Sequence, residues 1–283
     1  RLYLNDGKGN FSFSKEHTPD IFESGAVVKA YDYNNDGYTD LFIGSKLKPW
    51  NYPEPASSYI LKNNKGKLEV DPLNSKIFEN WGMVSDAVWT DIDNDNDNDL
   101  VVVGEWTSIR VYENIKGKLK LKSTPNLDAL KGWWFSVEEA DLDNDGDMDL
   151  VLGNLGENYK YKAKAESPFE VYYNDFDGNN KKDIVLTYYN YGIQYPLRGF
   201  SCSVQQVPEL ENKFKKYDVF ASLDATNVYG ELLNNSLNYD ATYFSSSVLL
   251  NLGSGDYIVK PLPTRAQFSS VNDILVDDYN NDN

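Results

Sequence analysis

The feature that most constrains this 283-residue chain is an acidic segment that recurs along it. In DLDNDGDMDL, residues 141–150, an aspartate occupies every second position and a short apolar run follows directly. Carboxylates at this spacing repel one another, so they disfavour a compact turn unless a positive charge lies among them. The segment therefore predicts a turn that holds a cation.

Five segments share this pattern, and they begin at Asp32, Asp91, Asp141, Asp175 and Asp278. Counting each first aspartate as position 1, positions 1, 3 and 5 are Asp or Asn, and position 9 is Asp in the four complete copies. Position 6 is Gly or Asn, the residue types that most readily adopt a left-handed backbone. Oxygens at positions 1, 3 and 5 can surround a hard divalent cation once position 6 reverses the chain. Position 7 varies freely, which predicts a backbone carbonyl ligand, and position 9 supplies a closing carboxylate.

The predicted metal residues follow from these positions, one set for each loop. They are Asp32, Asn34, Asp36, Tyr38 and Asp40; Asp91, Asp93, Asp95, Asp97 and Asp99; Asp141, Asp143, Asp145, Asp147 and Asp149; Asp175, Asp177, Asn179, Lys181 and Asp183; and Asp278, Asn280 and Asp282. The expected ion is Ca²⁺, with about four to five structural ions in all.

Two alternatives compete with this interpretation. An EF-hand requires a Glu at position 12 and flanking helices, whereas position 12 lies here inside runs such as LVVVG and LVLG, which predict buried strands. Metal-free Asn/Asp turns are the second alternative. The copies from Asp91 and Asp141 argue against it most strongly, because each holds five acidic residues, and the copy from Asp175 argues least.

Composition excludes several classes of function. The net charge of −17 argues against nucleic acid and anionic membranes as partners. No apolar run is long enough to span a bilayer, and the opening residues do not resemble a signal peptide. Cys202 and His17 are the only residues of their types, which leaves no ligand set for zinc and no catalytic triad.

A second motif organises the chain between the loops. LYLNDGKGNFSF, YILKNNKGKLEV, VYENIKGKLKL and LLNLGSGDYIV each predict a β-hairpin with a Gly-containing turn. Combined with an acidic loop between two strands, each hairpin completes a four-stranded unit of the kind that forms a propeller blade. The third unit is expected to be incomplete, because only 34 residues separate the third loop from the fourth.

The predicted fold is therefore an all-β propeller of four-stranded blades with DxDxDGxxD calcium loops. Residues 1–283 are expected to contain about five blades of a partial ring, incomplete at both ends. Residues 196–243 fit the repeat poorly, and Pro208 with the following aromatic residues predicts a small helical insertion there.

The repeated loops resemble the FG-GAP/VCBS repeat family, the calcium-loop propellers of integrin alpha chains and of large bacterial surface proteins. The resemblance implies calcium ligands at positions 1, 3, 5 and 9, a carbonyl ligand at position 7, and a binding or scaffolding role outside the cytoplasm. It thus implies an extracellular or cell-surface location, on the outer surface of a bacterium.

The leading hypothesis is a non-enzymatic, extracellular, calcium-stabilised module that binds a protein or glycan partner, or scaffolds a larger surface assembly. The alternative is a carbohydrate-binding propeller with glycoside hydrolase or lyase activity, in which Trp50 and Tyr52 of KPWNYPEP form an exposed aromatic pair. A glycosidase needs two carboxylates at a set separation, but every conspicuous acidic pair is already assigned to a loop.

Overall fold

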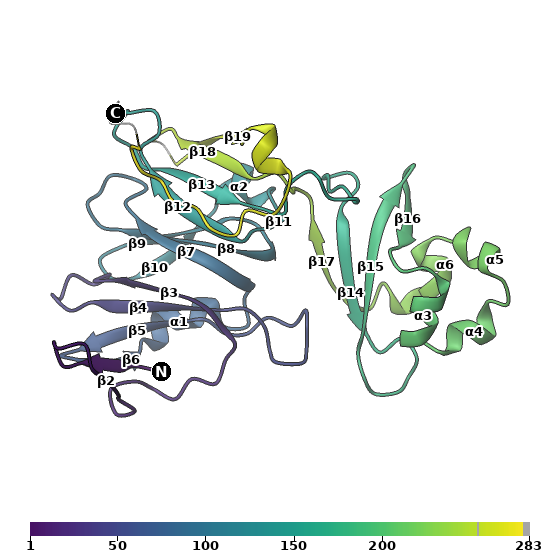
Figure 1. Ribbon diagram of the computed structural model, residues 1–283, viewed down its shortest axis with the longest axis horizontal. Helices are drawn as coiled ribbons and strands as arrows, with labels where there is room; N and C mark the ends of the chain where they lie inside the picture. Colours follow the sequence, from purple (N-terminus) through teal and green to yellow (C-terminus); the bar gives the residue numbers. More distant parts are fainter. Residues whose placement is uncertain (254, 280–283) are drawn as a thin grey trace.

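The computed structural model describes residues 1–253 and 255–279, which form antiparallel β-sheets joined by short helices (Figure 1). The first four-stranded sheet has the order β3 (Gly25–Tyr31), β4 (Asp40–Ser45), β5 (Tyr59–Asn64) and β6 (Lys67–Val70). The second has β7 (Met83–Thr90), β8 (Asp99–Thr107), β9 (Arg110–Asn114) and β10 (Leu119–Lys122), with the short β11 (Gly132–Trp133) also paired to β8. The prediction of an all-β fold built from four-stranded antiparallel sheets is confirmed.

The third sheet is assembled from two distant parts of the chain. Its strands are β12 (Ser136–Ala140), β13 (Asp149–Gly153), β18 (Ser247–Asn251) and β19 (Tyr257–Pro261). Leu152 of β13 pairs directly with Ser247 of β18. The intervening chain therefore leaves the sheet at the end of β13 and returns beside it at the start of β18. The expectation of an incomplete third unit is wrong, because the hairpin that completes the sheet comes after a long insertion.

The inserted chain carries a sheet of its own, drawn to the right of the stacked sheets in Figure 1. Its order is β16 (Ile193–Pro196), β15 (Asp183–Asn190), β14 (Phe169–Asn174) and β17 (Leu237–Ala241). The fourth acidic loop joins β14 to β15 and so belongs to this inserted sheet. It does not belong to a fourth blade in sequence order.

Helices of the insertion cover one end of this sheet. They are α3 (Phe200–Gln206), α4 (Glu209–Lys213), α5 (Tyr217–Ala221), α6 (Ala225–Tyr229) and the 3-10 helix η2 (Gly230–Leu232). Their apolar side chains form a small core with Phe176 of the fourth acidic loop and Val185 of β15. The segment 196–243, expected to be a helical insertion, is thus helical in its middle and ends in the strand β17.

The three stacked sheets pack through their first strands. β7 lies between β3 and β12, and a core of buried side chains fills each interface. Phe42 and Phe78 lie between the first two sheets, while Ile92 and Trp134 lie between the second and third. Each such fully buried apolar side chain contributes about 1.5–3 kcal/mol to stability. The described sheets form an open stack and do not close into a ring.

The remaining elements are short. The hairpin β1 (Tyr3–Asn5) and β2 (Phe11–Phe13) precedes the first sheet. The other helices are α1 (Pro72–Ser75), η1 (Lys76–Phe78), α2 (Pro125–Asp128) and η3 (Thr264–Gln267). Within the described part of the chain, no helix has the length and apolar character that crossing a membrane requires.

An aromatic cluster joins the inserted sheet to the stack. Phe169 of β14 is fully buried, and the centroid of its ring lies 5.9 Å from the ring centroid of Trp106 and 5.7 Å from that of Trp133. Tyr52 packs against the same cluster from the chain between β4 and β5. The inserted sheet is therefore fixed against the stack by a shared core.

Replacing Phe169 tests this junction. Phe169→Ala should lower the free energy of unfolding by about 3–5 kcal/mol, because it leaves a cavity among packed rings. The matched control is Phe22→Ala, since the Phe22 side chain is 88% exposed and its loss should change stability by less than about 0.5 kcal/mol. Urea unfolding of both variants measures the difference, and equal midpoints would contradict the shared core.

Candidate metal centres

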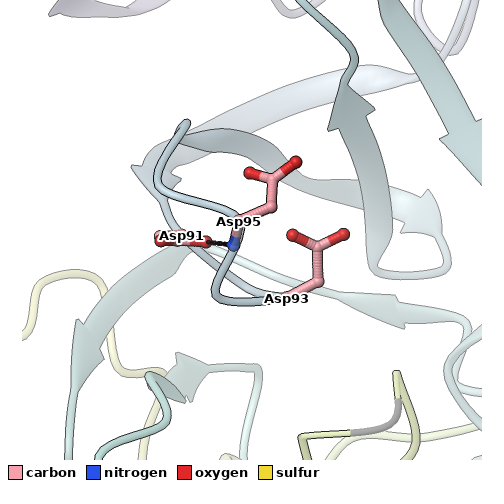
Figure 2. A group of neighbouring side chains, drawn as sticks. All are labelled: Asp91, Asp93 and Asp95. Atoms are coloured by element: carbon pink, nitrogen blue, oxygen red, sulfur yellow. Dashed lines mark hydrogen bonds between the residues drawn. The ribbon is translucent and has the colours of Figure 1, made fainter.

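Each complete acidic loop joins the first two strands of a sheet and folds around its position-1 carboxylate. In the second loop, Asp91 accepts a hydrogen bond from the backbone N–H of Asp95 at 3.2 Å (Figure 2). It accepts another from the backbone N–H of Asn96 at 3.0 Å. Asp32 and Asp175 accept the same two bonds in their loops, and Asp141 accepts the bond from Gly146. The four loops therefore share one backbone conformation.

The backbone turns at two positions of each loop. Asn94 and Asn96, at positions 4 and 6, have φ values of 60° and 70°, in the left-handed region. The same positions in the other loops also have positive φ: Asn35 and Gly37, Asn144 and Gly146, and Gly178 and Asn180. The sequence analysis identified position 6 and missed position 4. The signal was present, because position 4 is Asn or Gly in every complete copy.

The backbone N–H of position 7 donates a hydrogen bond to the side chain at position 5 of the same loop. The N–H of Tyr38 donates to Asp36 Oδ1 at 3.1 Å, and the equivalent bonds run from Asp97 to Asp95, from Asp147 to Asp145 and from Lys181 to Asn179. The use of the position-7 carbonyls as metal ligands stays a prediction.

The position-9 carboxylate begins the second strand and is buried. Asp99 is 1% exposed, and its Oδ1 accepts a hydrogen bond from the N–H of Asn114 at 2.7 Å. Its Oδ2 is buried without a hydrogen-bond partner. Asp40 and Asp149 are fully buried at the same position, and each accepts the equivalent bond, from Asn63 at 2.6 Å and from Asn251 at 2.8 Å.

Burial changes the electrostatics of these carboxyls. Desolvation is the largest effect and raises the pKa of Asp99 to about 7, although the hydrogen bond from the N–H of Asn114 lowers it; the negative charges of Asp93 and Asp97 act in the same direction as desolvation. Desolvation likewise raises the pKa of Asp40 to about 6. It also raises the pKa values of Asp93, Asp97, Asp143 and Asp183. In the absence of a cation, these carboxyls are therefore protonated more readily than an ordinary aspartate.

Three loops bring three carboxylates together, each offering an oxygen within 4.8 Å of the others. The groups are Asp91, Asp93 and Asp95; Asp141, Asp143 and Asp149; and Asp175, Asp177 and Asp183. Figure 2 shows Asp93 and Asp95 projecting side by side from the second loop. Besides Asp99 Oδ2, the oxygens Asp97 Oδ1 and Asp141 Oδ1 are buried without a partner. Convergent anionic oxygens with open bonding capacity fit a hard cation such as Ca²⁺.

The first loop is arranged differently. The side-chain amide of Asn34 donates to Asp40 Oδ2 at 2.8 Å, and Lys62 Nζ lies 3.3 Å from Asp36 Oδ2. Part of the negative charge of this loop is thus balanced by a protein group. Of the fifth predicted set, Asp278 is exposed, while Asn280 and Asp282 lie outside the described residues.

One functional residue type was missed by the sequence analysis. Asn114 and Asn251 are the last residues of the third strands of their sheets, and Asn63 is the last residue but one of β5; the backbone N–H of each donates to the position-9 carboxylate. Each side-chain oxygen accepts the N–H of a glycine in the following turn: Gly66, Gly117 or Gly253. The signal was an Asn before every predicted Gly turn, as in ILKNN, VYEN and LLN.

Comparison with known families agrees with this geometry. The family model of the FG-GAP-like repeat matches residues 1–43 and residues 91–152. The two matches contain the complete first, second and third acidic loops. These two segments match the FG-GAP-like repeat, in agreement with the resemblance of the motifs. A search of curated proteins found no match for the chain.

The raised pKa of Asp99 predicts a pH dependence for the calcium-depleted protein. Between about pH 4 and pH 7 the folded protein holds a proton that the unfolded chain releases, so stability should fall as pH rises through this window. Millimolar calcium should reduce or reverse this decline, because the ion replaces the proton.

Melting temperatures across this pH range, with and without calcium, provide the measurement. Asp99→Asn removes the charge and should flatten the decline in melting temperature of the calcium-depleted protein. The control Asp20→Asn, at an exposed position, should leave the decline unchanged. A melting temperature that rises with pH in calcium-depleted buffer would contradict the assignment.

Proposed function

We propose that this protein is a non-enzymatic, calcium-stabilised β-propeller module that binds a partner or scaffolds an assembly outside the cytoplasm. The observation that carries the proposal is the repeated carboxylate site, in which the buried oxygens Asp97 Oδ1, Asp99 Oδ2 and Asp141 Oδ1 have no hydrogen-bond partner. Such sites are costly when empty and stabilising when a dication occupies them.

The extracellular location follows from the chemistry of the ion. Extracellular calcium modules work with dissociation constants of about 10⁻⁴–10⁻³ M, and calcium outside cells is abundant enough to fill such sites. The FG-GAP repeats support the same location. The partner is a protein or glycan, or a larger surface complex, and the net charge of −17 disfavours nucleic acid. The bacterial outer surface is the location that the resemblance favours.

Calcium should raise the stability of the protein by a measurable amount. Calcium at a concentration 100 times the dissociation constant of a site stabilises the fold by about 2.7 kcal/mol. For a chain of this size this corresponds to an increase of roughly 5–10 °C in melting temperature per ion. Scanning calorimetry at increasing calcium concentration measures the effect.

Magnesium at equal concentration is the control for ionic strength, because it prefers a rigid octahedral site and should stabilise the protein less. A melting temperature that is the same in chelator and in millimolar calcium would overturn the calcium proposal.

A second candidate function is carbohydrate recognition, with or without cleavage. The side chain of Trp50 is fully exposed on the chain between β4 and β5, where an aromatic face is available for stacking on a sugar. Tyr52, its expected partner, is instead partly buried, and its hydroxyl accepts a bond from Trp106 Nε1 at 2.7 Å. Trp50 alone therefore favours this candidate.

A glycan array tests this second candidate. Trp50→Ala should abolish any glycan binding while leaving the melting temperature unchanged, because the side chain makes no buried contacts. Tyr191→Ala is the matched control, since Tyr191 is 98% exposed in the hairpin between β15 and β16. Analysis of any bound glycan for cleavage products distinguishes recognition from hydrolysis or lysis. An array on which the protein binds no glycan would reject this candidate.

A further inference from the structure

The three stacked sheets are joined along the edge that carries their acidic loops. Asn251 in the third sheet donates its side-chain amide to the carbonyl oxygen of Ile92 at 2.8 Å, and Ile92 is position 2 of the second loop. Asn114 in the second sheet makes the same bond to Tyr33, position 2 of the first loop, at 2.9 Å. Equivalent asparagines in the second and third sheets therefore link the acidic loop of each sheet to the loop of the preceding sheet.

Both asparagines are deeply buried and fully bonded. Asn114 is 2% exposed and Asn251 is 1% exposed. Each amide also reaches the carbonyl of position 8 in its own loop, at 3.2 Å to Asn98 and 3.3 Å to Met148. A buried amide with all its bonds satisfied fixes the groups around it, because breaking any bond leaves a desolvated polar atom.

The link reaches the carboxylates that close two neighbouring loops. The backbone N–H of Asn251 holds Asp149 Oδ1, and its side chain holds the carbonyl of Ile92. The backbone N–H of Ile92 in turn faces the carboxyl of Asp99 and lowers its pKa. A second bond joins the same two loops, from the amide of Asn94 to Asp147.

Burial of the position-2 side chains agrees with this arrangement. Ile92 is fully buried in the core between the second and third sheets, and Tyr33 is 2% exposed between the first and second. Position 2 is thus anchored on both sides, by its side chain in the core and by its carbonyl on the asparagine. Since position 2 lies between the ligand positions 1 and 3, its anchoring restricts both.

We propose that Asn114 and Asn251 are positioning residues that each support two calcium loops, one in their own sheet and one in the preceding sheet. This inference rests on the proposed calcium function. Removing one asparagine should therefore weaken calcium binding at a loop to which it contributes no ligand. Groups that orient the ligands of a metal typically change its affinity by about 10–100-fold.

The chain contains a matched control in the first sheet. Asn63 makes the bonds within its own sheet that the other two make: to Asp40 Oδ1 at 2.6 Å, to the carbonyl of Thr39 at 2.8 Å and from Gly66 at 2.7 Å. In the described part of the chain, its side chain is bonded to no second acidic loop. Its replacement should affect one loop.

The test separates the two roles of Asn251. Asp141→Asn with Asp143→Asn silences the third loop while keeping Asp149, the acceptor for Asn251. In this background Asn251→Ser retains a short side-chain oxygen for the turn glycine and loses the amide that reaches Ile92. Calcium titration calorimetry then measures the calcium affinity of the second loop. That loop is identified as the site lost when Asp91 and Asp93 are both replaced by Asn.

We expect Asn251→Ser to lower the calcium affinity of the second loop about 10-fold or more, and Asn63→Ser in the same background to leave it within about twofold. An unchanged affinity in Asn251→Ser would overturn the inference and leave the calcium proposal intact. A parent protein that binds no calcium would instead overturn the proposed function.

If Asn251→Ser does not melt cooperatively, Asn114→Ser serves as the second variant. Its background carries Asp91→Asn and Asp93→Asn, and the first loop is then the reporter, since Asn114 holds Tyr33 of that loop. Here a first-loop affinity equal to that of the background would contradict the proposal.

Discussion

The structure depends on how a row of carboxylates is accommodated at the start of a buried strand. The position-9 aspartates lie at the boundary between solvent and the core, where their charge is desolvated and the neighbouring aspartates repel it. A backbone N–H bonds one oxygen of each of Asp40, Asp99 and Asp149, and in Asp99 the second oxygen keeps its bonding capacity toward the loop. Protons, Lys62 in the first loop and divalent ions are three ways to balance that charge. The bonds that hold the loop, together with its left-handed turns, arrange the oxygens for the last of these.

The acidic loops could be predicted because their signals are local. Alternating aspartates, a Gly or Asn at position 6 and an apolar run after position 9 all lie within about a dozen residues, and each has a direct physical reason. Strand type and the hairpins followed from equally local patterns. The asparagine that supports the loops was also visible before each Gly turn, but its importance depends on a bond to another sheet that no single repeat reveals.

The connectivity of the third sheet could not be predicted in this way. The regular spacing of the loops suggested that each belonged to the next blade, whereas the fourth loop lies in a sheet inserted between β13 and β18. Pairing between those strands depends on residues far apart in the chain, and neither strand carries a mark of its partner. Similarly, KPWNYPEP predicted two exposed aromatic side chains, but Tyr52 is partly buried because it packs against the aromatic cluster that joins the inserted sheet to the stack.

The split of the third sheet also sets an order of events during biosynthesis. A ribosome adds about 5–20 residues per second, so the roughly 90 residues between β13 and β18 delay completion of the sheet by about 5–20 s. For that interval β13 leaves the ribosome with one edge unpaired, and such an edge is open to association with other strands. The insertion, with its local hairpin and its own small core, can fold first and cover the aromatic cluster. The nested arrangement therefore makes the nascent chain most vulnerable to aggregation just before Ser247 emerges.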